Sequence, residues 1–152
     1  GKVYKACVRR VMVYGSETWP MRLEDMQRLE RAERMMVRWM CGVSLKNRIS
    51  SKELNDRLGV VCVTEVVRQG RLRWFGHLER KGKDEWVSAC RNVFVEGERG
   101  RGRGRKTWEE CVKQDLKLYG LTKEDAMDRD AWRDIVGSRP TRASMEKRTL
   151  NR

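Results

Sequence analysis

Apolar side chains recur every three or four positions along much of the chain, which is the spacing of one face of an α-helix. The longest such stretch covers residues 23–40, where charged residues separate the apolar ones. Gly42 follows it, as a glycine after a helix C-terminus would. The stretch therefore predicts one long helix. Its core-facing positions are expected to be Leu23, Met26, Leu29, Met36, Val37 and Met40.

A shorter amphipathic helix is predicted for residues 2–13, with Arg9 and Arg10 on its polar side. Its apolar stripe is expected to comprise Tyr4, Cys7, Val8, Val11 and Met12. After this helix, Pro20 disfavours helical geometry at Trp19 and marks a boundary. We expect Trp19 to pack onto the core, because single tryptophans in folded domains are usually buried. Stacking on a nucleic-acid base is the alternative for this side chain.

Several helix starts are marked by a Ser or Thr with an acidic residue three positions later. Ser50 and Thr107 each precede a glutamate in this way, and the helices that they begin are expected to end at Gly59 and Gly120. Thr122 precedes an aspartate at the same spacing and predicts a last short helical region. That region is expected to place three apolar side chains against the core, Trp132, Ile135 and Val136.

Residues 64–83 predict a helix with two different faces. One stripe, widened by Phe75, is formed by Val67, Gly70, Trp74 and Leu78. The opposite face, or positions beside it, carries Arg68, Arg71, Arg73 and Arg80. We therefore expect one side of this helix to be core and the other to be an exposed cationic ridge.

These patterns together predict about six or seven helices and no convincing strand. Residues 60–63 have a strand-like composition, but an isolated strand has no partner, so we interpret them as a buried connection. Residues 84–95 predict one or two further helical turns. The predicted fold is all-α, a small multi-helix bundle with a Gly/Arg-rich flexible segment and a disordered C-terminal tail.

Composition divides the chain into four predicted segments. Residues 1–95 form a helical domain, 96–106 a Gly/Arg-rich linker, and 107–137 a C-terminal helical segment. Residues 138–152 carry many cations and almost nothing apolar, which predicts a disordered basic tail. The chain begins with Gly1 rather than Met, and we expect it to be a fragment or a processed chain.

The formal net charge of +13 is unevenly distributed. Residues 68–83 carry +5, residues 99–106 carry +5 and residues 138–152 carry +4, so the rest of the chain carries −1. Clustered cations on an otherwise neutral body are typical of a polyanion binder, because each neutralised phosphate releases condensed counterions. We therefore expect nucleic acid as the partner; a solvated, solubilising surface is the alternative.

The Gly/Arg-rich segment is the strongest single indication of this partner. Its cations are expected to form a mobile arm for phosphates, Arg99, Arg101, Arg103, Arg105 and Lys106. The segment leads into the helix that begins after Thr107, where unpaired backbone N–H groups favour anions. We expect the arm and this helix N-terminus to hold the same phosphate chain.

No catalytic, metal-ligating or cofactor-binding pattern is recognisable. The five cysteines stand far apart, and His77, the only histidine, is expected to be a partly buried structural residue. An odd number of cysteines without a signal peptide indicates reduced thiols, most of them buried, in the nucleus or cytoplasm. The acids of residues 124–130 match no metal-binding loop. We predict no catalytic residue, metal or cofactor, and no membrane partner, since no apolar run could span a bilayer.

Four stretches carry a family resemblance when they are taken in order. They are YGSETW at 14–19, RLRWFGHLER at 71–80, GRGRKTWEECVKQDL at 102–116 and DRDAWRDIV at 128–136. Together they resemble the region that follows the polymerase palm in reverse transcriptases of LINE-type, non-LTR retrotransposons. The resemblance implies that the first helices correspond to the thumb, which grips the primer–template duplex. It also implies that the later part handles template RNA or target DNA.

The resemblance also has limits that shape the expected function. The family's catalytic aspartates and its endonuclease domain have no counterpart here, so the chain is not expected to polymerise alone. Many members have a proline where this sequence has Gly104, and the zinc knuckle of some relatives is missing. The implied role is a non-catalytic, nucleic-acid-binding part of an RNA-directed DNA polymerase, with the parent's palm domain as a further partner. The alternatives are a decayed or domesticated element that binds another protein and, third, a cryptic hydrolase.

Overall fold

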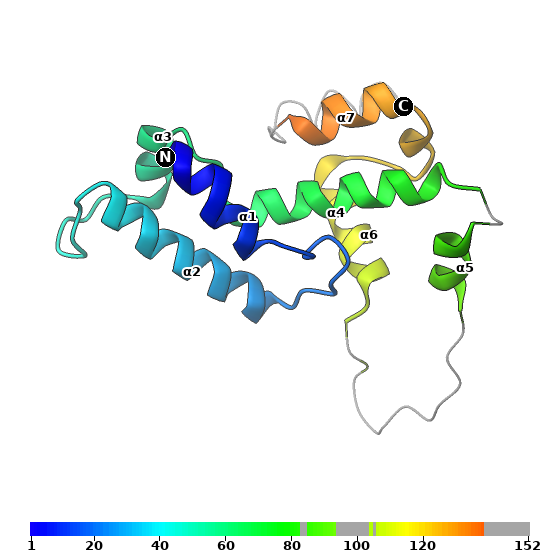
Figure 1. Cartoon of the computed structure of the whole chain (residues 1–152), viewed down its shortest axis with the longest axis horizontal. Helices are drawn as coiled ribbons and strands as arrows, with labels where there is room; N and C mark the ends of the chain where they lie inside the picture. Colours follow the sequence, from blue (N-terminus) through cyan, green and yellow to red (C-terminus); the bar gives the residue numbers. More distant parts are fainter. Residues whose placement is uncertain (83–84, 94–103, 105, 139–152) are drawn as a thin grey trace. The chain divides into compact units, whose positions relative to one another are not determined.

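The computed structural model describes residues 1–82, 85–93, 104 and 106–138. Within these residues the regular secondary structure is helical throughout, with seven α-helices and no strand (Figure 1). The predicted all-α class is confirmed. The chain divides into two compact units, residues 1–70 and 71–152, with the boundary inside α4 (Val63–Glu79). The predicted linker at 96–106 falls almost wholly outside the described residues, and the predicted domain bounds stay a prediction.

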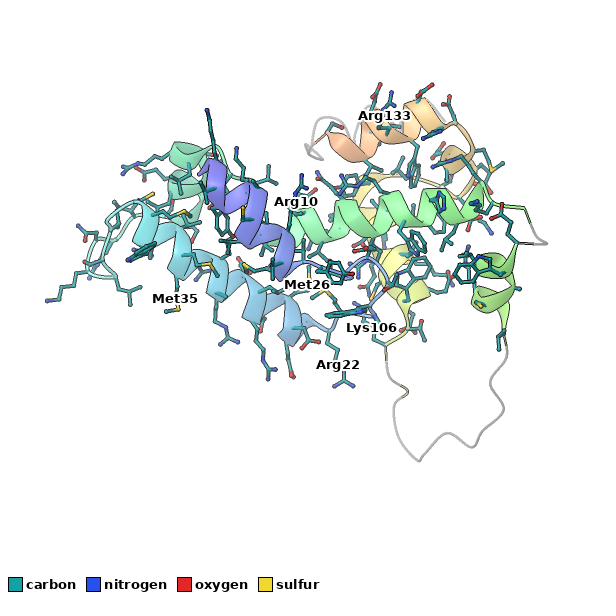
Figure 2. All side chains as sticks on the ribbon, in the orientation of Figure 1. Arg10, Arg22, Met26, Met35, Lys106 and Arg133 are labelled. Atoms are coloured by element: carbon teal, nitrogen blue, oxygen red, sulfur yellow. The ribbon has the colours of Figure 1, made fainter. Side chains whose placement is uncertain are left out.

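The first unit contains a short helical segment, made of η1 (Tyr4–Val8) and α1 (Arg9–Met12), followed by α2 (Leu23–Met40), α3 (Ser51–Leu58) and the start of α4. The bounds of α2 are those predicted, and Gly42 after it has a φ of 62°. Such a positive φ favours glycine, which has no Cβ. On its outer face Met35 projects away from the helix (Figure 2). The start of α3 is confirmed by Ser50, whose Oγ accepts a hydrogen bond from the Glu53 N–H at 3.1 Å.

The first helical segment turns different residues inward from those predicted. Tyr4 and Arg9 are buried, whereas Cys7, Val8 and Val11 are exposed. The segment η1 is a π-helix, in which the Arg9 N–H bonds to the carbonyl of Tyr4 five residues earlier. This wider turn brings residues five apart to one side. The predicted apolar stripe followed α-helical periodicity and is therefore wrong at these three positions.

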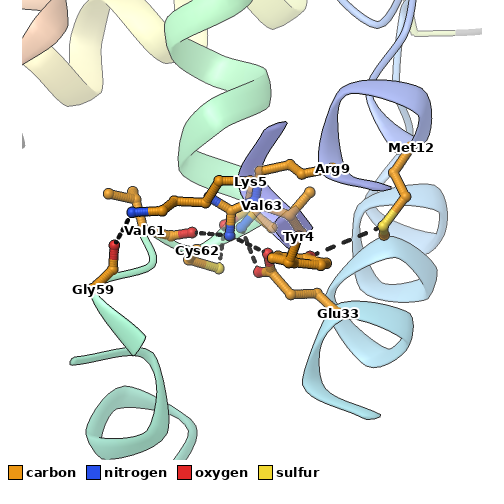
Figure 3. Close-up of polar contacts among 10 residues, drawn as sticks. Tyr4, Lys5, Arg9, Met12, Glu33, Gly59, Val61, Cys62 and Val63 are labelled. Carbon is orange, nitrogen blue, oxygen red and sulfur yellow. Dashed lines mark hydrogen bonds and ion pairs between the residues drawn. The ribbon is translucent and has the colours of Figure 1, made fainter. Parts of the chain in front are cut away.

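Arg9 is buried because Glu33 of α2 pairs with it. Glu33 also accepts a hydrogen bond from the Tyr4 hydroxyl at 2.9 Å and one from the Val63 N–H at 2.6 Å (Figure 3). Burial, together with the hydrogen bond and charge of Glu33, raises the pKa of Tyr4 to about 12, although Arg9 opposes the shift. One carboxylate thus connects the first helical segment, α2 and the start of α4.

The rest of the first unit is held by a small apolar core. Its buried side chains are Tyr4, Met21, Val37, Leu54, Val60, Val63 and Val67. Residues 60–62 form the predicted connection, in which Val60 is buried but Val61 is exposed, and the buried Val63 begins α4. Trp19 is 56% exposed, so the prediction that it packs onto the core is wrong.

The second unit contains the remainder of α4, then α5 (Trp86–Asn92), α6 (Trp108–Tyr119), η2 (Glu124–Met127) and α7 (Arg129–Gly137). The helical turns predicted in 84–95 correspond to α5. The capping box at the start of α6 is confirmed in both directions. The Thr107 N–H donates to Glu110 Oε2 at 2.9 Å, and the Glu110 N–H donates to Thr107 Oγ1 at 3.2 Å.

The core of the second unit is rich in aromatic side chains. It comprises Leu72, Phe75, Val112, Tyr119, Leu121, Ala126, Trp132 and Val136, with Ile135 packed against it. The placement predicted for α7 is therefore confirmed. The indole N–H of Trp132 donates to the Leu72 carbonyl at 3.1 Å, and a Cβ added at Gly76 would lie 2.8 Å from Trp132 Cδ1. Gly76 is therefore needed for α7 to approach α4 this closely.

Candidate nucleic-acid interface

Arg71, predicted to lie on an exposed cationic ridge, is buried in the second unit. Its side chain is paired with Asp115 of α6, with Nε 2.7 Å from Oδ2, and the whole residue is only 3% exposed. The prediction for Arg71 is therefore wrong. Successive helix residues are rotated by about 100°, so Arg71 and Arg73 point in nearly opposite directions. The signal that was missed is Asp115, an acid on the otherwise apolar stripe of α6, where a buried partner is required.

The other arginines of α4 differ in exposure. Arg73 is exposed, as predicted. Arg80 is half-buried, and its Nη1 donates to the Ala126 carbonyl at 2.6 Å, which leaves further N–H donors on the guanidinium. In the first unit, Arg68 is half-buried with Nη1 3.6 Å from Glu65 Oε2. A continuous ridge of four exposed arginines is therefore not present.

The predicted mobile arm lies mostly beyond what the structure describes. Arg99, Arg101, Arg103 and Arg105 are outside the described residues, so their role stays a prediction. Lys106 is described (Figure 2). Its Nζ donates to Gln114 Oε1 of α6 at 2.7 Å. This bond holds the Lys106 side chain along the surface of α6.

Two lysines of α6 extend this basic surface and were not identified from the sequence. Lys113 and Lys117 are both exposed and lie one helical turn apart. Their spacing of four residues is the signal that could have revealed them. Lys106 precedes the helix, and its bond to Gln114, three residues before Lys117, holds its side chain near them. Together they form the α6 lysine face (Lys106, Lys113 and Lys117).

The N-terminus of α6 is already occupied by acidic side chains. Glu110 accepts the Thr107 N–H, and the first turn also contains Glu109. Two carboxylates in this turn already interact with the positive end of the helix dipole and repel a third anion. The expectation that this N-terminus holds the same phosphate chain as the Gly/Arg-rich segment stays a prediction, since most of that segment lies outside the described residues.

Arg91 of α5 forms ion pairs with other helices of the second unit. Its guanidinium pairs with Glu79 and with Glu109, the latter at 2.7 Å, and lies 5.6 Å from the ring centre of Phe75. Burial lowers the pKa of Arg91, but hydrogen bonds and attraction from Glu109 and Glu79 outweigh it, so the pKa is raised overall. Arg91 is therefore held as a cation that joins α4, α5 and α6.

The structure offers no grouping for metal or nucleophilic chemistry in the part of the chain that it describes. No three or more His, Cys, Asp or Glu side chains are close enough there to hold a metal ion.

His77 is exposed and stacks on Trp74 with ring centres 5.4 Å apart, so its expected burial is wrong. All five cysteines are free thiols, but only Cys111 is fully buried, which corrects the expectation that most are.

Two further observations bear on the class of protein. Among the described residues, none of the helices combines the length and apolar character needed to cross a bilayer. No protein-family model matches the chain, and no curated protein or solved structure matches it either. The resemblance to LINE-type reverse transcriptases therefore rests on the four sequence stretches quoted above.

Proposed function

We propose that the chain is a non-catalytic helical module that binds the nucleic-acid backbone, as the thumb and post-thumb region of a LINE-type reverse transcriptase would. The observation that supports it most is the pairing of the interior cations. Arg9, Arg71 and Arg91 are each matched by at least one acid inside the structure. These pairings join three arginines to four acids, so the net charge of +13 is carried by side chains outside them, which supports binding to an external polyanion.

In the second unit the phosphate-binding groups would be the α6 lysine face, Arg73 and Arg80. Lysines bind phosphate as point charges and arginines through forked N–H donors, and neither requires a particular base. The predicted arm, Arg99 to Arg105, would add contacts along the same backbone. Binding of this kind neutralises phosphates and releases counterions, so it should weaken steeply with salt.

A salt titration tests the proposal. Fluorescence anisotropy would measure the affinity of the full chain for a labelled RNA–DNA hybrid duplex at several salt concentrations. We expect log affinity to fall against log salt with a slope of about −0.9 per phosphate engaged. The double variant Lys113→Gln, Lys117→Gln should flatten that slope by about 1 to 2. A matched control is Arg133→Gln on α7, because Arg133 already pairs with Asp130 at 3.2 Å. A salt-independent affinity would contradict the proposal.

A protein-interaction module is the second candidate, and a specific observation favours it. Val3, Val11 and Tyr14, in and beside the first helical segment, are large apolar side chains that are exposed in the structure. Exposed apolar groups that gather on one element indicate a protein contact. Absence of measurable affinity for duplex and single strand, even at low salt, would favour this function over the first.

A further inference from the structure

Residues 34–52 form a second basic region. It was not evident from the sums of charge over longer segments. These residues contain Arg34, Arg38, Lys46, Arg48 and Lys52, and no Asp or Glu. The acids that offset this charge belong to residues 84–98 and 107–137, which carry −3 each, so the +5 of residues 34–52 does not show in the total of −1 for the rest of the chain. In the fold, this region covers the end of α2, the loop after it and the start of α3.

The loop after α2 is held in place by Arg38. The guanidinium of Arg38 donates to three backbone carbonyls, those of Ser44 at 2.9 Å, Asn47 at 3.3 Å and Ile49 at 2.8 Å. The side chains of Ser44 and Asn47 share a further hydrogen bond of 2.7 Å. Because three carbonyls converge on one planar group, the loop has a defined conformation beside the end of α2.

Trp39, the residue after Arg38, presents its indole to solvent and is 84% exposed. Leu45, in the loop that Arg38 holds, is 82% exposed. Lys46 and Arg48 in the same loop are exposed and have no ionic partner among the described residues. We call these four residues the Trp39 corner. A tryptophan this exposed is unusual, because its large apolar surface is normally buried.

We propose that the Trp39 corner binds an unpaired stretch of nucleic acid, with one base stacked on the indole and adjacent phosphates held by Lys46 and Arg48. The combination of an aromatic ring and unpaired cations matches a ligand with flat apolar faces and a negatively charged backbone. A duplex does not offer such a face, since its bases are already stacked on one another. The inference depends on the proposed function for its ligand class, but its residues are separate from those of α4 and α6.

Two oligomers of equal length separate stacking from phosphate binding. One is an oligothymidylate of about 12 nucleotides, and the other is its abasic counterpart, which has the backbone without bases. We expect Trp39→Ala to weaken binding of the full chain to oligothymidylate by about 5- to 100-fold and to leave the abasic oligomer unaffected. Trp39→Phe should retain much of the affinity, because phenylalanine also stacks. Lys46→Gln with Arg48→Gln should weaken both oligomers.

The control is Trp86→Ala, which removes another exposed tryptophan, 76% exposed on α5 of the second unit. It should change neither affinity, and circular dichroism should show that all variants keep their helices. If Trp39→Ala has no effect, or weakens both oligomers equally, the stacking site is overturned, whereas salt-dependent binding to the duplex would leave the proposed function standing. Absence of binding to every oligomer and duplex would overturn both. Trp39-dependent binding of an acidic peptide, without any of oligothymidylate, would overturn the inference in favour of a protein partner.

Discussion

The two units of the chain both bury an arginine, but they stabilise it in different surroundings. In the first unit, Arg9 pairs with Glu33, and the same carboxylate accepts hydrogen bonds from Tyr4 and the Val63 N–H. In the second unit, Arg71 pairs with Asp115, and the core contains three aromatic rings, those of Phe75, Tyr119 and Trp132. The first helical segment therefore depends on one polar group, whereas α7 of the second unit depends mainly on apolar packing.

The difference reflects how much apolar surface each helix can bury. Within residues 2–13, Tyr4 is the only buried apolar side chain, so apolar contact alone fixes this helical segment weakly. The carboxylate of Glu33 adds direction as well as energy, because hydrogen bonds from three different elements meet on it. In the second unit, α7 buries Trp132 and Val136 completely and needs no such connection. A short helix with little apolar surface is thus held by a polar hub.

The largest expected effect comes from removing this hub. Glu33→Ala leaves Arg9 buried without its counter-charge and removes the acceptor of the Tyr4 hydroxyl. We expect the free energy of unfolding to fall by about 3 to 5 kcal/mol, measured by urea denaturation with circular dichroism. The control is Glu30→Ala on the same helix, since Glu30 pairs with Arg34 at 3.4 Å and both side chains are nearly half exposed. That change should cost less than about 1 kcal/mol.

The second effect is a dependence of stability on alkaline pH in the first unit. The pKa of Tyr4 is raised to about 12 in the folded chain, against about 10 when unfolded. This raised pKa contributes stability below pH 10, and the contribution is lost as the pH rises through 12. The stability difference between the wild type and Tyr4→Phe should therefore shrink by about 2 to 3 kcal/mol over that window. A difference that stays constant up to pH 12 would argue against an ionisable hub.

The third effect tests apolar packing in the second unit through two glycines of the same helix. Gly76→Ala places a methyl group against the Trp132 ring and should destabilise the chain by about 1 to 3 kcal/mol. At Gly70 no atom lies within 4 Å of an added Cβ. Gly70→Ala should therefore stabilise α4 by up to about 1 kcal/mol through its better helix propensity. Thermal unfolding of both variants checks the opposite signs; two changes of the same sign would show that Trp132 does not require Gly76.

Local sequence signals predicted the helices well. The bounds of α2, the Thr107 capping box and the glycines that end three helices all depend on residues within a few positions of one another. The inward positions of α7 were also predicted, because α-helical periodicity applies there. In the first helical segment the backbone follows a π-helix, and a pattern read with α-helical spacing selected the wrong face.

The candidate site was harder to predict, because exposure depends on neighbours that are distant in the sequence. Arg71 and Arg73 look equivalent in the sequence, yet one is an internal cation and the other is exposed. Trp19 was expected inside and is exposed, and the Trp39 corner was hidden because charge was averaged over long segments. The wrong predictions therefore concern the exposure of side chains and not the positions of helices.

The amino-acid sequence by itself determined the helical class, the caps and the excess of positive charge, since each follows from composition or from contacts between near neighbours. Only the tertiary structure decided which cations leave the surface. Arg9 meets Glu33 across 24 positions and Arg71 meets Asp115 across 44, and a buried charge is tolerated only where such a partner reaches it. Whether an arginine can bind phosphate is therefore set by packing between helices, which no local pattern records.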